Sequence, residues 1–267
     1  MTKIAGHSDT RMRKRIAAAL ADIEREHRVR ILLAIESGSR AWGFPSSDSD
    51  WDVRFVYVRP LDAYLRIEAL PDVIEVPLVD ELDLNGWDLR KALVLLVGSN
   101  AVVLEWLASP IVYQRDEEAC ATLAGLRHSA GYLPALAYHY DRLARRHWSL
   151  GPDKKIRFKT LFYTLRPSLA LSWINDRKTA PPMDMQSLLA GLSLPPALVE
   201  AIESLRALKL AATEVDTIEV PPSVEAFLTE VLSDPAPRAE GWDKTQLLSM
   251  ANETFFRMVV NRSGRDA

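Results

Sequence analysis

A Gly-Ser pair and two carboxylates stand close together in the first fifth of the chain. Gly38 and Ser39 are followed, after ten intervening residues, by Asp50 and Asp52. Glycine lets the backbone approach an anion closely because it has no Cβ, and serine adds a hydroxyl donor. On a strand, side chains two residues apart point to the same side, and like charges so placed repel unless a cation lies between them. The spacing therefore predicts a cation site beside a phosphate site.

Mg²⁺ is the cation that we expect at Asp50 and Asp52, because it prefers carboxylates together with substrate phosphate oxygens. Two ions held by the pair would contact both an attacking oxygen and a leaving pyrophosphate, and Mn²⁺ is expected to substitute. The five histidines and the single cysteine have no spacing suited to zinc. The alternative explanation of the motif is an Asp-rich surface turn, which needs no ligand.

The segments on either side of the motif have the patterns of β-strands. Residues 29–35 form a short β-branched apolar run, and residues 51–58 alternate and are rich in aromatic and β-branched side chains. Residues 38–50 are rich in Gly, Ser, Pro and Asp, which predicts a loop or turn. Further strand segments are expected at 73–79 and 81–84.

Helical patterns surround these strands and dominate the second half of the chain. Residues 11–28 have apolar side chains at helical spacing, and the helical period returns from Gly86 onward. Later helices are expected at 116–128, 133–149, 154–175, 195–211, 222–233 and 243–262. A strand-bearing front followed by helices predicts an α+β fold. We expect a small mixed or antiparallel sheet with helices at 1–112, and an all-helical domain at 113–267 that contributes to the substrate cleft.

The motif resembles the signature of the polymerase-beta-like nucleotidyltransferase superfamily. That signature consists of an apolar residue, Gly-Ser, a spacer of this length and then Asp-apolar-Asp-apolar. Four stretches are also similar to a bacterial and phage subfamily of predicted nucleotidyltransferases associated with RNA repair and RNA ligases. These stretches are residues 38–43, 49–54, 86–91 and 104–110. The similarity extends from about residue 29 to residue 183, which is more than half of the chain.

The resemblance implies transfer of a nucleoside monophosphate from an NTP, such as ATP, to a hydroxyl, with release of pyrophosphate. Gly38 and Ser39 would hold the β- and γ-phosphates, and Asp50 and Asp52 would bind two metal ions. The acceptor implied by the subfamily is the 3′ end of an RNA. Two alternatives stay open: nucleotidylation of a protein or of a small molecule such as an antibiotic, and a non-catalytic nucleotide-binding regulator. The intact acid pair favours catalysis.

The superfamily uses a third carboxylate on a later strand, and Asp83 is the residue that we assign to this role. Asp83 stands at the end of an expected strand and would complete the site of the catalytic metal. Asp80, Glu81 and Asp88 are alternatives. Asp88 also has a structural explanation, because an acid in the first turn of a helix interacts favourably with the helix dipole.

Five side chains near the motif have both functional and structural explanations. Arg40 is assigned to the triphosphate and Arg54 to one of the motif carboxylates, although each is equally consistent with a structural ion pair. Glu36 is assigned as a partner of Arg40. Trp42 and Trp51 are expected in the core rather than stacked on a base.

Positive charge is concentrated in one stretch of a chain whose formal net charge is −3. Residues 140–178 contain ten Lys or Arg side chains against three Asp, a local field that attracts phosphates. Within this stretch, Lys155, Lys159 and Arg166 are expected on one helical face that binds the nucleotide. The alternative is an amphipathic helix whose basic side chains extend into solvent.

The composition limits the class of protein. Apolar residues make up 48% and charged residues 26% of the chain, as in ordinary globular domains. No run approaches the length of a membrane span, and the basic N-terminus lacks the apolar core of a secretory signal. Cys120 is the single cysteine, which excludes an internal disulfide and fits a cytoplasmic location. The pI of about 6.0 is low for a nucleic-acid-binding domain, in contrast to the basic stretch.

Overall fold

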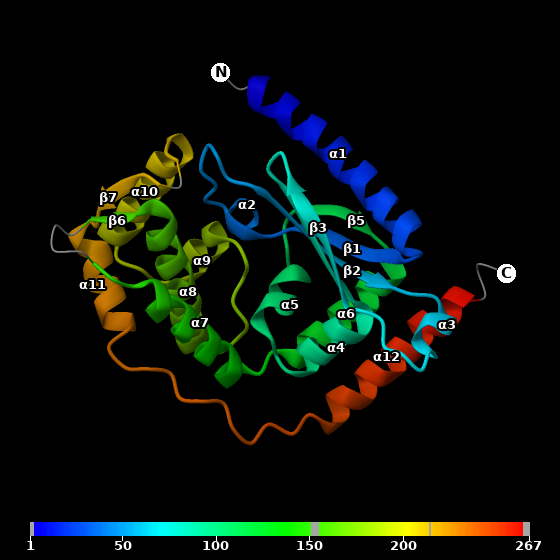
Figure 1. Ribbon diagram of the computed structural model, residues 1–267. Helices are drawn as coiled ribbons and strands as arrows, with labels where there is room; N and C mark the ends of the chain where they lie inside the picture. The colour runs from blue at the N-terminus through cyan, green and yellow to red at the C-terminus, as the bar shows by residue number, and fades with distance from the viewer. Residues whose placement is uncertain (1–2, 151–154, 214, 264–267) are drawn as a thin grey trace.

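The structure combines a five-stranded mixed sheet with many helices (Figure 1). The computed structural model describes residues 3–150, 155–213 and 215–263. In spatial order, the strands are β3 (Val73–Val79), β4 (Leu82–Asp88), β2 (Trp51–Val58), β1 (Arg30–Glu36) and β5 (Val112–Arg115). The mixed α+β class predicted from the sequence is confirmed.

Pairing in the sheet brings the motif strand beside the strand of the assigned third acid. β2 runs parallel to β4 and antiparallel to β1, while β3 and β5 pair antiparallel at the two edges. In the parallel register, Asp52 lies opposite Asp83. Because side chains alternate along a strand, the neighbouring Val53 and Leu84 point to the other face, where both are buried in one core. Asp52 and Asp83 therefore share one face of the sheet.

β4 is longer than the strand expected at 81–84. Its pairing with β2 continues to Trp87 and Asp88, so α4 (Leu89–Val97) begins three residues after Gly86. The ring of Phe55 fills the space that a Cβ of Gly86 would occupy, which explains a glycine inside this strand. The sequence pattern predicts an earlier end of the strand, because glycine is uncommon inside strands.

Helices cover both faces of the sheet (Figure 1). α1 (Lys3–His27) lies on one face, where Ile16 and Leu20 share a buried core with Val53 and Phe55. α4, α6 (Glu117–Ala130) and α12 (Thr245–Ser263) enclose the second core, which contains Val56 of β2. Three short helices connect these parts: α2 (Gly38–Trp42), α3 (Leu61–Tyr64) and α5 (Ala101–Trp106). Across the described residues, no helix has the length and apolar content needed to cross a membrane.

A helical group with its own hydrophobic core lies beside the sheet (Figure 1). That core is formed mainly by α8 (Phe158–Arg177), α9 (Met185–Gly191), α10 (Pro196–Ala211) and α11 (Pro222–Val231). α7 (Leu133–His147) packs on α8, and its buried Leu136 and Tyr140 belong to the core shared with the sheet. Phe44, from the loop that follows α2, is 1% exposed and belongs to this core. The loop between the Gly-Ser pair and the motif acids is therefore anchored in the helical group.

The all-helical character expected for residues 113–267 is not confirmed. β6 (Lys155–Arg157) and β7 (Thr217–Glu219) form a two-stranded antiparallel sheet, and most of β5 also lies in this part of the chain. In addition, α12 packs against α3, α4 and α6, so the chain returns to the main sheet after the helical group. The packing around the sheet therefore extends past the expected boundary at residue 112.

Candidate active site

The turn after β1 places Gly38 directly against the carboxylate of Asp52. The backbone N–H of Ser37 donates to the carbonyl of Asp52 (2.8 Å), which joins this turn to β2. Gly38 has a φ of +59°, and a Cβ at this position would clash with Oδ2 of Asp52. Only glycine satisfies both conditions without strain. The two halves of the sequence motif therefore meet in space, as their spacing predicts.

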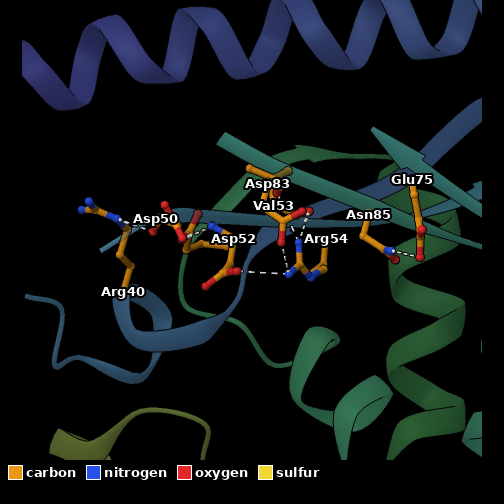
Figure 2. A network of polar contacts seen from close by, with 9 residues as sticks. Arg40, Asp50, Asp52, Val53, Arg54, Glu75, Asp83 and Asn85 are labelled. Carbon is orange, nitrogen blue, oxygen red and sulfur yellow. Dashed lines mark hydrogen bonds and ion pairs between the residues drawn. The ribbon is translucent and has the colours of Figure 1, made fainter. Parts of the chain in front are cut away.

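Asp52 and Asp83 are linked through one arginine (Figure 2). Nη2 of Arg54 lies 3.0 Å from Oδ1 of Asp52 and 2.7 Å from Oδ2 of Asp83. Arg54 also donates to the backbone carbonyls of Val53 and Asp83. The ion pair predicted for Arg54 is confirmed, and it joins two of the three assigned acids.

The negative charges here exceed the positive charge that Arg54 supplies. Burial raises the pKa of Asp52, the charges of Asp83 and Asp50 raise it further, and Arg54 and Lys159 oppose these effects. We name Asp50, Asp52 and Asp83 the acidic cluster. Because burial and the neighbouring acids raise the pKa of Asp52 despite Arg54 and Lys159, an additional positive charge is favourable here.

The donor set of the acidic cluster suits Mg²⁺, which prefers carboxylate oxygens. As arranged in the described residues, however, no three Asp, Glu, His or Cys side chains already lie close enough together to coordinate one ion. Arg54 lies between Asp52 and Asp83 and provides the positive charge there. A metal ion between these two acids would therefore replace contacts that Arg54 now makes.

The alternatives to Asp83 have other positions in the fold. Asp88 is the N-cap of α4, where its side chain accepts a hydrogen bond from the backbone N–H of Arg90. This agrees with the structural explanation given above. Asp80 and Glu81 form the turn between β3 and β4 with positive φ angles, and Asp80 pairs with Arg15 of α1. Of these acids, only Asp83 shares an arginine with Asp52.

Arg40 is held by the loop rather than directed at a ligand. Its guanidinium donates to the carbonyls of Ser49 (2.7 Å) and Asp50 (3.0 Å) and lies 4.0 Å from the ring centroid of Trp51. Trp51 itself is buried, as expected. Ser39 is also buried, and its hydroxyl donates to Oγ of Ser49 (3.1 Å). The phosphate-binding roles of Arg40 and Ser39 stay predictions.

The three basic residues expected on one helical face are separated in the structure. Lys155 lies in β6, and α8 begins only at Phe158. The expected helix at 154–175 therefore starts later, and residue 154 itself lies outside the described part of the chain. Lys159, in the first turn of α8, is exposed and near enough for its charge to lower the pKa of Asp52. Lys159 is thus the member of the set that the fold brings toward the acidic cluster.

Arg166 is 2% exposed and belongs to a buried polar cluster instead. Its Nη1 donates to Oε1 of Glu105 (2.6 Å), and its Nε and Nη2 donate to the carbonyl of Met183 (3.1 and 2.9 Å). Glu105 also accepts from the hydroxyl of Tyr140 (2.8 Å) and from Nε1 of Trp42 (3.3 Å). These contacts correct the assignment of Arg166 to the nucleotide. We name Glu105, Arg166, Tyr140 and Trp42 the Glu105 cluster.

Glu36, at the end of β1, is fully buried beside the acidic cluster. Its carboxylate accepts from the hydroxyl of Tyr113 (2.6 Å) and from the backbone N–H of Asp52 (3.0 Å). Burial raises the pKa of Glu36 to about 7. The hydrogen-bonding partners are therefore Tyr113 and Asp52, while Arg40, the partner expected from the sequence, acts on Glu36 through its charge, which lowers the pKa of Glu36.

The sequence does not predict the positions of several side chains that lie close to the site. Ser46 and Ser49 stand in a segment that was expected to be a loop, and both are buried. Lys209 reaches Ser46 from α10 (3.2 Å), which is remote in sequence. Lysine on an amphipathic helix normally predicts an exposed position, so no local pattern indicates that Lys209 lies here.

Comparison with known proteins identifies the family of the chain. A family model described as the RNA repair pathway DNA polymerase beta family matches residues 12–257. The uncharacterized protein YcgL of Bacillus subtilis (strain 168) is 46% identical over 208 residues, which cover 77% of this chain and 79% of that protein. The residues that the family model matches include the Gly-Ser turn, the acidic cluster and the helical group. The chain therefore belongs to the RNA repair pathway DNA polymerase beta family.

Proposed function

We propose that this protein transfers a nucleoside monophosphate from an NTP to a hydroxyl group in a Mg²⁺-dependent reaction that releases pyrophosphate. The observation that carries the proposal is the contact between Gly38 and Asp52. Asp83 lies opposite Asp52 on the neighbouring strand β4. Because Gly38 has no Cβ, the turn assigned to the phosphates lies directly against carboxylates that favour a cation. Membership of a polymerase-beta family supports nucleotidyltransferase chemistry.

The residues have distinct proposed roles. Gly38 and Ser39 hold the β- and γ-phosphates, and Lys159 neutralises part of the triphosphate charge. Asp50 and Asp52 hold two Mg²⁺ ions, for which Mn²⁺ substitutes, and Asp83 completes the site. When bound, these ions neutralise charge on the attacking and leaving oxygens. The protein contributes by positioning and charge rather than through a covalent intermediate.

The proposed acceptor is the 3′ end of an RNA. A cavity of about 770 Å³ along α7 is lined by Tyr138, His139, Arg142, Leu143, Arg145 and Arg146. His139, Arg142 and Arg146 follow helical spacing, so they form a stripe on one face. His147, the last residue of α7, contacts the ring of Tyr163, which also lies near Lys159. Arginines along α7, together with the aromatic ring of Tyr163 near Lys159, favour a polyanionic strand over a small molecule.

Two other functions would use the same nucleotide site. One is nucleotidylation of a protein or a small molecule, and the other is nucleotide-dependent regulation without catalysis. The low overall pI supports the first, because it weakens general attraction to nucleic acid. We place the reaction in the cytoplasm, where NTPs and RNA are both available.

The test is to incubate the protein with each α-labelled NTP, Mg²⁺ and, in separate reactions, cell RNA, the same RNA with blocked 3′ ends, and cell protein. We expect label on RNA with free 3′ ends only, and its loss in Asp50→Ala. Asp48→Ala is the matched control, since Asp48 is an exposed acid of the same loop and should keep the labelling. Label on protein would support the first alternative, and bound nucleotide without any labelled product would support the second.

A further inference from the structure

A fully buried lysine lies behind the Gly-Ser turn. Lys209, in the last turn of α10, is 1% exposed. Its ammonium donates to Oγ of Ser46 (3.2 Å) and lies 5.7 and 5.9 Å from the ring centroids of Phe44 and Phe162. Removing an ammonium from water is costly, and an apolar side chain of similar length would avoid that cost. The contact with Ser46 and the two contacts with aromatic rings are features that lysine provides and methionine does not.

Ser46 is the first member of a chain of buried hydroxyls that ends at Ser39. Oγ of Ser46 and Oγ of Ser49 are 2.9 Å apart, and the backbone N–H of Ser46 also donates to Oγ of Ser49 (2.9 Å). The hydroxyl of Ser39 donates to the same oxygen (3.1 Å). We name Ser46, Ser49 and Ser39 the serine chain. It connects the ammonium of Lys209 to the residue assigned to the phosphates.

The number of donors and acceptors fixes the direction of the serine chain. Oγ of Ser49 has two acceptor sites, which the N–H of Ser46 and the hydroxyl of Ser39 fill, so Ser49 must donate to Ser46. Oγ of Ser46 then accepts from both Ser49 and Lys209. If Ser39 turns its hydroxyl to a phosphate, Ser46 can donate to Ser49 and Ser49 to Ser39. The ammonium group of Lys209 can only donate hydrogen bonds, so it remains the donor to Ser46 in both arrangements.

The same end of α10 is attached to the loop at further points. Nη2 of Arg206 donates to the carbonyl of Gly43 (3.0 Å), and the backbone N–H and hydroxyl of Ser47 donate to the carbonyl of Ala212 (3.1 and 2.9 Å). In Figure 1, α10 accordingly lies next to the loop that follows α2. Arg206 thus attaches the helix to the loop without contacting the serine chain, which makes it a matched control for Lys209.

We propose that Lys209 is a positioning residue that orients the hydroxyl of Ser39, through Ser46 and Ser49, toward the phosphates of the NTP. The inference rests on the proposed function, in which Ser39 contacts those phosphates. A charge-assisted donor at the end of the chain favours the arrangement in which each hydroxyl donates outward, toward the anion. Lys209 does not touch the substrate and acts only through the serine chain.

The test is a double-mutant cycle on the dissociation constant of Mg²⁺-ATP, measured by equilibrium dialysis, for Lys209→Met, Ser49→Ala and the double variant. Each single change should weaken ATP binding about tenfold, and the double variant should be no weaker than Ser49→Ala alone. Arg206→Met combined with Ser49→Ala should instead give additive effects. In transfer assays, Lys209→Met should raise the KM for ATP and leave the KM for the acceptor unchanged.

Three outcomes separate this inference from the proposed function. Additive effects of Lys209→Met and Ser49→Ala, or unchanged ATP binding in Lys209→Met, would overturn the role of Lys209 alone. Absence of both ATP binding and transfer in the unmodified protein would overturn the proposed function and the inference with it. If Lys209→Met does not fold, Ser46→Ala replaces it in the cycle, because it removes the same link and keeps the lysine; additivity with Ser49→Ala then counts against the inference.

Discussion

Two charged clusters lie at the two ends of α2, and they differ in how far the negative charge of their carboxylates is compensated by neighbouring cations. At Gly38, the acidic cluster has three carboxylates, of which Asp52 and Asp83 share one arginine, and the pKa of Asp52 is raised although Arg54 and Lys159 oppose the shift, so carboxylate charge is not fully compensated. At Trp42, the Glu105 cluster pairs one carboxylate with one arginine and two neutral donors. The first arrangement favours an additional cation, whereas the second already satisfies every charge. Excess carboxylate thus marks where a ligand should bind, and balanced charge marks where helices are joined.

The largest expected effect comes from removing charge in the acidic cluster. Asp52→Asn should reduce nucleotidyl transfer by at least about a thousandfold, because it weakens the proposed metal site. The same change should leave the free energy of unfolding unchanged or raise it by about 1 kcal/mol, since it removes a buried charge and its repulsion from Asp83 and Asp50, which together outweigh the lost pairing with Arg54. Labelled-NTP transfer and urea unfolding measure the two quantities. A marked loss of stability in Asp52→Asn would break the comparison.

The next largest effect should come from the Glu105 cluster, and it should change the free energy of unfolding rather than the transfer reaction. Glu105→Gln leaves Arg166 buried without a counter-charge, so the free energy of unfolding should fall by about 3–5 kcal/mol. The control is Glu253→Gln, which removes an exposed pair with Arg257 and should change stability very little. Both values come from urea titration. Equal stability of the two variants would show that the Glu105 cluster does not join the helices as proposed.

The smallest expected effect is on the pH dependence of the free energy of unfolding, which tests the neighbourhood of the acidic cluster. Glu36 lies beside the acidic cluster, and burial raises its pKa from 4.5 to about 7. The folded state therefore retains a proton that the unfolded state loses, so stability should fall by about 2–3 kcal/mol as pH rises from about 4.5 to 7. Glu36→Gln should lack this part of the pH dependence. Urea unfolding at pH 5 and pH 8 measures it, and identical pH dependence in both proteins would contradict the assignment.

Much of the fold was accessible from local patterns. The strands at 29–35, 51–58 and 73–79 correspond closely to β1, β2 and β3, and most of the later helices occur near their expected ranges. The strand expected at 81–84 was too short, because a glycine in the sequence indicates a strand end. Gly86 instead continues the strand, and its missing Cβ makes room for the ring of Phe55. The additional strands β6 and β7 contain only three residues each, which is too short for a periodic signal.

The candidate site divides in the same way. The sequence by itself determined that Gly38 precedes Asp52 at a distance that lets a turn and a strand meet, and that alternate residues of that strand share a face. Only the tertiary structure decided that Arg54 links Asp52 to Asp83, that Arg166 is buried against Glu105, and that Lys209 reaches the serine chain. The physical reason is range. Backbone geometry fixes the direction of side chains within a few residues, whereas contacts between remote elements depend on how whole helices and sheets pack.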